Sequence, residues 1–437
     1  MESGEIISVL EKWNFWNRDI DTGIRRDHTD AIKPTLDLDK VITLTGVRRC
    51  GKSYIARQLA KILIERKIPP ENILIVNFEE PYFEGADLND LVKIYESYRE
   101  IIKPSGKPYL ILDEIQEVSK WEKFVRSINE KKEANIIITG SSSKLMSEEL
   151  ATTLTGRQLT YRIFPLSFKE FLRFKGLEIA DEKSAYLNTE NIKKFLWEYA
   201  ESGGFPETAL IEDKDIQNRI VFEYYNTIIN RDIISRFRIR GVDKIKSLAK
   251  YYISNISSPI TYRKLSPVLD TPVETLSRFS EYLQTSNIVF FLDRFSFSLK
   301  EQQNSPRKVY AIDNSFFTAI GFRFMENRGK LIENLAAVEL RRRCEASPSL
   351  SYFYWKDQQQ REVDFVIKEG NKIKQVIQVC YSLDDLQTKE REIKGLKRAA
   401  KVLNCKNMSI ITWDEEGSID TEEGKIKIIP LWKWLFF

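Results

Sequence analysis

The chain has 437 residues, of which 42% are hydrophobic and 30% are charged, a composition typical of a folded globular protein with about three domains. The 68 basic and 64 acidic residues leave a net charge of only +4, so the overall charge does not identify a nucleic-acid partner. One histidine and four cysteines without paired spacing argue against a histidine triad or a zinc site, and without an apolar run of ~18 residues or a signal pattern we expect a cytoplasmic protein that makes no membrane contact.

Residues 1–35 contain one helical stretch with a cluster of aromatic side chains, Trp13, Phe15 and Trp16. Aromatic side chains supply much of the contact area in cores and at interfaces. We therefore predict an N-terminal arm that docks on the core of the protein, and a contact between subunits is the alternative.

A phosphate-binding loop is predicted between residues 41 and 54. An apolar run of strand character leads into a glycine turn and an amphipathic helix, and residues 46–53 match the pattern G-x-x-x-x-G-K-[ST]. The two glycines let backbone N–H groups approach phosphate oxygens, the lysine supplies charge for the β- and γ-phosphates, and the serine hydroxyl can bind Mg²⁺. A plain glycine turn would contain the same letters, but the flanking strand and helix favour nucleotide binding. The predicted contacts are Gly46, Val47, Arg48, Arg49, Cys50, Gly51, Lys52 and Ser53.

A second buried strand is predicted in ENILIVNFEEP at residues 71–81. Two acidic residues end a later core strand, in the sequence YLILDEIQ at residues 109–116. The apolar residues predict a strand buried on both faces, as in a parallel sheet. Asp113 would hold Mg²⁺ directly or through water, and Glu114 would orient and polarise the attacking water. Acids that end a strand can also be mere solvent caps, but an upstream phosphate-binding loop favours the catalytic interpretation.

A further core strand, ANIIITGSSS at residues 134–143, ends in small polar residues. Ser141 or Ser142 could contact the γ-phosphate or the water beside Glu114, and a capped turn is the alternative. Beyond this strand, Arg157 follows Gly156. Its forked, permanently charged guanidinium could reach the phosphates of a neighbouring subunit, or it could form an ordinary surface salt bridge.

The ordered set GVRRCGKS, LDEIQ, ITGSSS, LTGR and FPLSFKEFL, followed by SGGFPE, resembles prokaryotic P-loop ATPases of the AAA+ superfamily. It is most similar to the subgroup whose ATPase core is joined to a C-terminal domain of degenerate restriction-nuclease fold. The resemblance is strong over residues 36–210 and weaker beyond. It implies an α/β fold with a parallel-sheet core and a helical lid, ATP and Mg²⁺ as cofactors, and a homo-oligomer, with a hexamer as one option.

The same resemblance implies roles for individual residues. Lys52 and Ser53 would bind ATP and Mg²⁺, and Asp113 and Glu114 would drive hydrolysis; these four match by motif. A γ-phosphate sensor at Ser141 or Ser142 and an arginine acting across subunits at Arg157 match only by their order in the chain. The expected domains are an N-terminal arm (1–35), an ATPase core (36–164), a helical lid (165–242), a winged helix (243–325) and a degenerate nuclease-like domain (326–437).

The winged-helix prediction depends on element order. Three helical segments precede two apolar strands, NIVFFLDRF and RKVYAID, which is the order of a module that often binds DNA. Winged helices also dock on proteins, so both partners stay open. The residues expected on the reading helix are Thr271, Thr275, Ser277 and Arg278.

The last 110 residues resemble the PD-(D/E)xK nuclease core, with Glu333 on a helix and Asp364 on the second strand. In an active enzyme the third strand would add an acid and a lysine that bind the metal and activate water. Here that strand carries Gln378, Val379 and Cys380. An amide is a poorer Mg²⁺ ligand than a carboxylate, and a thiol lacks the charge of lysine, so we expect no nuclease activity.

The sequence therefore predicts an ATP-hydrolysing AAA+ ATPase whose C-terminal domains act on or bind DNA without cutting it. The preference for DNA is an analogy of fold. One alternative is an ATP-driven remodelling or signalling switch that binds a protein partner, and another is an ATP-gated defence nuclease.

Overall fold

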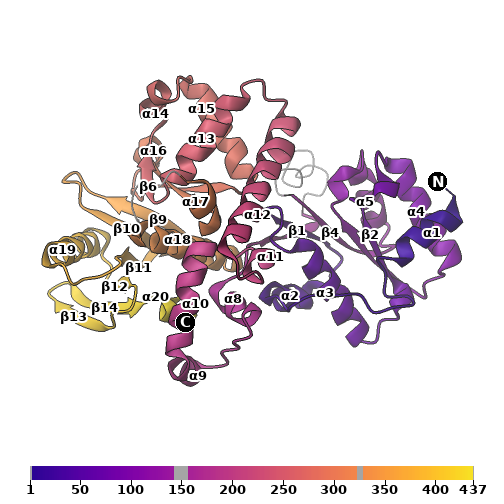
Figure 1. Ribbon diagram of the computed structural model, residues 1–437, viewed down its shortest axis with the longest axis horizontal. Helices are drawn as coiled ribbons and strands as arrows, with labels where there is room; N and C mark the ends of the chain where they lie inside the picture. The colour runs from indigo at the N-terminus through magenta and orange to yellow at the C-terminus, as the bar shows by residue number, and fades with distance from the viewer. Residues whose placement is uncertain (1, 142–155, 322–327, 437) are drawn as a thin grey trace. The chain divides into compact units, whose positions relative to one another are not determined.

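The computed structural model describes residues 2–141, 156–321 and 328–436. The chain forms two compact units, Met1–Phe164 and Pro165–Phe437, and most of their elements are labelled in Figure 1. Within the described ranges, none of the helices is both long enough and apolar enough to span a lipid bilayer.

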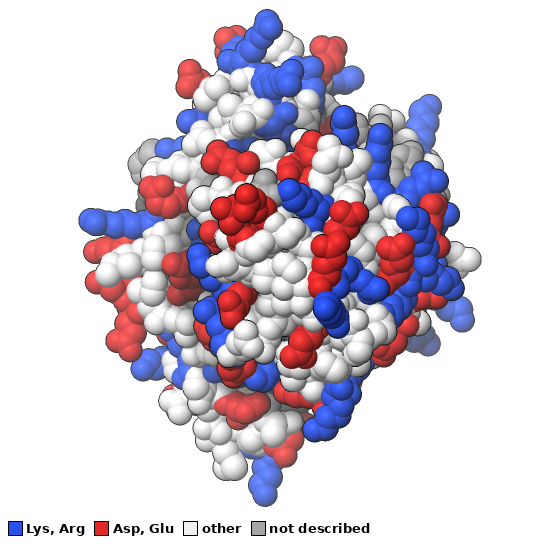
Figure 2. All heavy atoms as spheres, turned by 90° about the vertical axis from the view of Figure 1, so that its right-hand side faces the viewer, with Lys and Arg blue, Asp and Glu red and all other residues white. Residues whose placement is uncertain are grey.

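Charged side chains of both signs cover the surface shown in Figure 2, where Lys and Arg are interspersed with Asp and Glu. This mixture agrees with the near balance of 68 basic and 64 acidic residues in the sequence. On this face, attraction for a polyanion would therefore be offset by nearby acids.

The first unit is built on a five-stranded sheet in the order β2-β3-β4-β1-β5. Every neighbouring pair in it is parallel. The central strands are continuous apolar runs because both of their faces are covered. In register, Gly46 lies opposite both Ser141 and Ile163, and Asn77 lies opposite Asp113, so the polar strand ends share one edge. The strands are β1 (Val41–Gly46), β2 (Ile73–Asn77), β3 (Tyr109–Asp113), β4 (Asn135–Ser141) and β5 (Gln158–Ile163).

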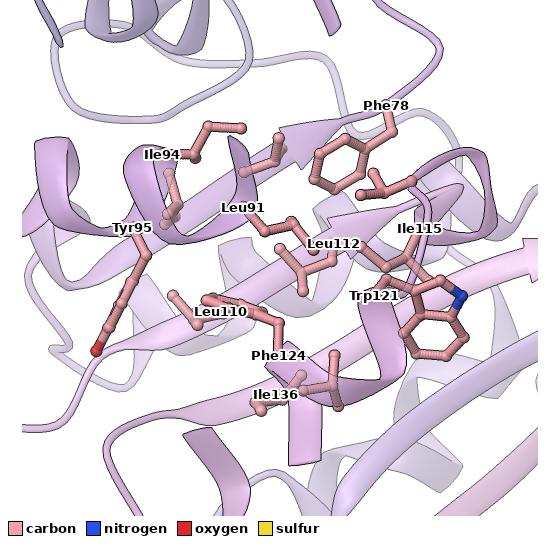
Figure 3. Close-up of a cluster of buried hydrophobic side chains, with 14 of the residues drawn as sticks. Phe78, Leu91, Ile94, Tyr95, Leu110, Leu112, Ile115, Trp121, Phe124 and Ile136 are labelled. Carbon is pink, nitrogen blue, oxygen red and sulfur yellow. The ribbon is translucent and has the colours of Figure 1, made fainter. Parts of the chain in front are cut away.

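Helices α4 and α5 pack their apolar sides against this sheet (Figure 3). Tyr95 of α4 meets Phe124 of α5 edge to face, with the ring centroids 6.0 Å apart. Leu110 and Leu112 of β3 and Ile136 of β4 belong to the same buried cluster. The helices of this unit are α1 (Ser3–Glu11), α2 (Asp27–Ile32), α3 (Lys52–Glu65), α4 (Leu88–Ile101) and α5 (Trp121–Glu130).

The N-terminal arm docks on this unit, as its aromatic cluster predicted. The Asn14 side chain is fully buried; its amide donates to the Ile75 carbonyl at 2.8 Å and its oxygen accepts from the Ile75 N–H at 2.7 Å. The Trp16 indole donates to the Ile73 carbonyl at 3.0 Å. The arm is therefore tied to the backbone of β2.

The second unit begins with helices that pack on one another and on later elements. The Phe168 ring of α8 contacts Tyr199 of α10 and also Phe436 near the C-terminus. Helices α8 and α10 thus share a packed core with the end of the chain. The elements are α8 (Phe168–Phe174), α9 (Glu182–Leu187), α10 (Thr189–Ser202), α11 (Pro206–Ala209), α12 (Lys214–Thr227), a π-helical segment (Ile228–Ser235) and α13 (Val242–Ser254).

A small antiparallel sheet, in the order β6-β8-β7, follows α13. The two apolar strands expected from the sequence are β7 and β8, and a short helix, α16, lies in the connection between them. Helices α14 and α15 precede this hairpin. The bounds are β6 (Ser258–Ile260), α14 (Tyr262–Val268), α15 (Val273–Thr285), β7 (Val289–Leu292), α16 (Leu299–Asn304), β8 (Arg307–Ala311) and α17 (Asn314–Ile320).

The rest of the unit is a six-stranded mixed sheet in the order β13-β14-β12-β11-β10-β9. Its β9, β10 and β11 are antiparallel, whereas β11, β12 and β14 run parallel. The apolar C-terminal helix packs on this unit, and the Trp434 carbonyl accepts from Arg343 at 2.7 Å. The elements are α18 (Arg328–Ala346), β9 (Leu350–Lys356), β10 (Glu362–Glu369), β11 (Lys372–Val379), α19 (Leu386–Leu403), β12 (Met408–Thr412), β13 (Gly417–Thr421), β14 (Gly424–Pro430) and α20 (Leu431–Phe436).

Candidate nucleotide-binding site

The loop between β1 and α3 is held in a shape that requires glycine. A Cβ atom at Gly46 would lie 2.2 Å from the Ile163 carbonyl oxygen, which is closer than a side chain can approach. Gly51 caps α3 with φ of 100°, a left-handed conformation that favours glycine. The Val47 and Cys50 side chains are buried, so these two residues can offer a ligand only their backbone groups.

Lys52, the first residue of α3, is 5% exposed and lies over this loop. Its ammonium donates to the carbonyls of Gly46 and Val47, both at 3.4 Å, and lies 3.7 Å from the Glu114 carboxylate. Burial lowers the pKa of Lys52, but the charge of Glu114, together with Cys50 and Asp113, leaves the pKa above its ordinary value. The Lys52 ammonium therefore lies, positively charged, where the loop would bind phosphates.

Asp113 lies at the carboxyl end of β3, beside the first turn of α3. Its carboxylate accepts from the Ser53 hydroxyl at 3.1 Å and from the Thr139 hydroxyl. Burial, together with the Glu114 charge, raises the pKa of Asp113 to about 6, against the lowering effect of these hydrogen bonds. The Ser53 and Asp113 oxygens thus converge on one point, as the two protein ligands of a nucleotide-bound Mg²⁺ would.

Glu114 follows in a left-handed conformation, with φ of 52°. Its side chain is 9% exposed, and its carboxylate accepts from the Gln116 amide. Burial raises the pKa of Glu114, but the nearby Lys52 and Arg48 charges lower it further, so the net shift is downward. A charged, oriented carboxylate therefore stands beside the loop.

Thr139 of β4 is a site residue that the sequence analysis missed. It is fully buried; its hydroxyl donates to Asp113 and accepts from the Glu114 N–H at 3.0 Å, so one side chain orients both acids. Ser141 lies two residues on, on the same side of the strand, and is also buried. The alternation of β4 could have marked Thr139. Ser142 lies outside the described residues.

Two loop arginines differ in their surroundings. The Arg48 side chain is 11% exposed and pairs with Glu79, which follows β2, at 2.9 Å. Arg49 is exposed and has a positive φ of 69°. The Arg48 charge also lowers the pKa of the buried Glu114, and Glu79 is a second residue that no local motif marked.

Arg157 lies far from the loop of its own chain. Its carbonyl accepts from the Val41 N–H at the start of β1, at 2.8 Å, whereas the loop follows the other end of that strand. At about 3.3 Å per residue the separation is roughly 17 Å. The Arg157 guanidinium is 43% exposed and pairs with Glu130, as the surface salt-bridge alternative predicted.

A second cluster of acids, in the second unit, contains a lysine that the sequence analysis did not identify. Lys308 of β8 is 2% exposed, and its ammonium lies 3.0 Å from Glu333, 2.7 Å from Glu362 and 2.8 Å from Asp364. Burial and the charge of Asp364 raise the pKa of Glu333 to about 7. Gln378 accepts the Asp364 N–H at 3.1 Å, so its amide supports the backbone. Among the described residues, no group of His, Cys, Asp and Glu side chains is arranged to hold a metal ion.

The prediction for the reading helix needs one correction. Thr271 lies before α15, not on it; it is 3% exposed, and its hydroxyl donates to the Leu269 carbonyl at 2.7 Å. Its side chain shapes the turn that begins α15 and is not available to a ligand. Thr275 is partly exposed on this helix, and Ser277 and Arg278 are exposed.

Comparison with known proteins gives matches along most of the chain. Residues 38–172 match the family model described as an AAA domain, and residues 193–326 and 328–434 match two domains of unknown function. An uncharacterized protein of Methanocaldococcus jannaschii is 37% identical over 410 residues, 91% of this chain and 88% of the relative. An uncharacterized protein of Haemophilus influenzae is 30% identical over 368 residues, 83% and 87% of the two chains. Among solved structures, a Walker-type ATPase of Pyrococcus abyssi aligns with a TM-score of 0.45 and 16% identity over 68% of this chain and 96% of that one.

Proposed function

Because the chain belongs to the same family as the Methanocaldococcus and Haemophilus relatives and carries an AAA domain at residues 38–172, we propose that it binds and hydrolyses ATP with Mg²⁺ and uses its second unit to engage DNA without cutting it. The observation that carries the ATPase part is the convergence of Lys52, Ser53, Asp113 and Glu114 at one edge of a parallel sheet.

The residues at this edge of the sheet would have different roles in phosphoryl transfer. The loop N–H groups and Lys52 would bind the phosphates, and Ser53 and Asp113 would hold the metal ion. Mg²⁺, when bound, would neutralise charge on the β- and γ-phosphate oxygens. Glu114 would orient and polarise the attacking water, and Thr139 would keep both acids in position.

Two features of the second unit support a DNA partner that is bound and not cut. The order of α13, β6, α14, α15, β7 and β8 is that of a winged helix, and Ser277 and Arg278 are exposed on α15. The acids of the degenerate nuclease-like domain that would otherwise hold a metal ion, Glu333, Glu362 and Asp364, instead surround Lys308, which β8 contributes. Both identifications are proposals from fold order and contacts.

The direct test is the ATPase rate of the full chain with double-stranded, single-stranded and branched DNA, at low and moderate salt, beside gel-shift binding with Mg²⁺. We expect stimulation by one DNA form, binding that weakens steeply with salt because phosphate contacts release counterions, and no cleavage. An Arg278→Gln variant should bind DNA more weakly than wild type, and its DNA affinity should depend less steeply on salt concentration.

An unchanged ATPase rate without DNA binding would contradict the DNA part and favour a protein-directed switch. Metal-dependent cleavage that disappears in an Asp364→Ala variant would favour the nuclease. Absence of ATPase activity in all conditions would contradict the main proposal.

We further propose that the protein forms a homo-oligomer in which Arg157 acts on the nucleotide of a neighbouring subunit, since it lies at the opposite sheet edge from its own loop. Arg157→Ala and Glu114→Gln proteins should each be impaired. Mixing them should restore part of the activity, because some interfaces would then contain both intact groups. No recovery in such mixtures, checked against each variant alone, would contradict the trans role.

A further inference from the structure

A fully buried arginine from the N-terminal arm contacts the phosphate-binding loop. Arg26 precedes α2 and is 1% exposed. Its guanidinium donates through Nη1 to the Cys50 carbonyl at 2.7 Å and through Nη2 to the Phe164 carbonyl at 2.8 Å. Cys50 belongs to the loop, and Phe164 follows β5. One side chain therefore joins the end of the loop to the end of the edge strand.

The contact with Cys50 sets the direction of a neighbouring N–H group. A trans peptide is planar, so the Cys50 carbonyl and the Gly51 N–H point in opposite directions. Holding the carbonyl on Arg26 therefore turns the Gly51 N–H away from Arg26. Backbone N–H groups of such loops cradle the α- and β-phosphates, and their affinity depends on being aimed before the ligand arrives.

Arg26 is itself held by the helix that follows the loop. The Gln58 oxygen accepts from the Arg26 N–H at 3.1 Å, and its amide donates to the carbonyls of Thr22 and Ile24, both at 2.8 Å. Gly23, with φ of 62°, lies so near the Tyr54 ring that a Cβ atom would be 2.8 Å from it. We call residues 22–26 the strap. The strap is fastened to α3, whose first residue is Lys52.

We propose that Arg26 is a positioning residue for nucleotide binding, which fixes the peptide between Cys50 and Gly51 so that the Gly51 N–H faces the α- and β-phosphates. The inference rests on the proposed function as an ATPase. The strap precedes residues 38–172, which match the AAA domain. The residue that positions the phosphate-binding loop therefore lies outside that domain.

The test uses the full chain with Arg26→Gln and Arg26→Lys, and calorimetric titration with ATP and with ADP. Arg26→Gln should weaken both nucleotides by the same factor, roughly ten- to a hundredfold, because the affected N–H serves phosphates that both share. Arg26→Lys should recover only part of the lost nucleotide affinity. The lysine keeps the positive charge, but its ammonium lacks the fork that spans two carbonyls. Arg25→Gln is the matched control, because Arg25 is 67% exposed and pairs with Asp30 at the surface.

A general loss of folding is separated from this effect by two further measurements. Gln58→Met loosens the strap without altering the guanidinium or the loop, and it should weaken ATP and ADP equally but less than Arg26→Gln does. Hydrogen exchange of peptides covering residues 46–53, without nucleotide, should be faster in both variants and unchanged in Arg25→Gln.

Wild-type affinity for ATP and ADP in folded Arg26→Gln protein would overturn the inference. If Arg26→Gln does not fold, wild-type affinity in Gln58→Met would overturn it instead. A wild-type chain that binds no nucleotide would contradict the proposed function, and the exchange measurement would then still show whether the strap orders the loop.

Discussion

Glu114→Gln protein is expected to bind ATP with wild-type affinity and to hydrolyse it about 10²–10⁴-fold more slowly. Glutamine keeps the size of the side chain and its contact with Gln116, but its amide cannot polarise water as a carboxylate does. The Thr139 hydroxyl should still accept from the backbone N–H of residue 114, so the site should keep its shape. Single-turnover hydrolysis and equilibrium titration of the same preparation measure the two effects separately.

Lys52→Ala supplies the contrast that makes this result specific. It removes the charge that lies over the loop carbonyls, so ATP binding itself should be lost. Two variants in neighbouring positions would then fail for different reasons, one at binding and one at the chemical step. Normal turnover in Glu114→Gln would remove Glu114 from the mechanism.

Lys308→Met protein is expected to lose about 3–5 kcal/mol of unfolding free energy in its second unit, because removing one partner leaves buried charges without compensation. The methionine fills most of the space of the lysine stem. The acids left behind are Glu333, Glu362 and Asp364, of which Asp364 is only 7% exposed. Urea unfolding would measure the loss of free energy. Hydrogen exchange of peptides from β10 and β11 would show that the loss lies in this unit.

A charge-neutral combination is the control for this prediction. Lys308→Met with Glu333→Gln, Glu362→Gln and Asp364→Asn should recover part of the stability, since the uncompensated buried charges that destabilise the single variant are then absent. Lowering the pH should also reduce the loss of unfolding free energy that Lys308→Met alone causes. Burial already raises the pKa of Glu333 to about 7, so the folded state binds protons that the unfolded state lacks, and stability falls as pH rises toward 7. A full deficit at pH 5 would contradict the charge explanation.

The residues that the sequence could predict belong to contiguous motifs. Lys52 lies in a loop whose glycines, lysine and serine are consecutive, and Asp113 ends a run of strand character, so local pattern places both at one sheet edge. Arg26, Thr139 and Lys308 obtain their roles from partners 24 to 138 residues away. Nothing local distinguishes a buried arginine or lysine from an exposed one, because both residue types are usually at the surface.

The side-chain amide of Asn14 has a consequence for how the chain is made. It pairs with both polar groups of Ile75 on β2, the last strand on its side of the sheet. An outer strand with unpaired N–H and C=O groups can recruit strands from other chains and start aggregation. Residue 14 leaves the ribosome before residue 75, and domains begin to fold during synthesis. The cover for this strand is therefore already present when the strand emerges, and chains that lack the first 16 residues should aggregate as they are synthesised.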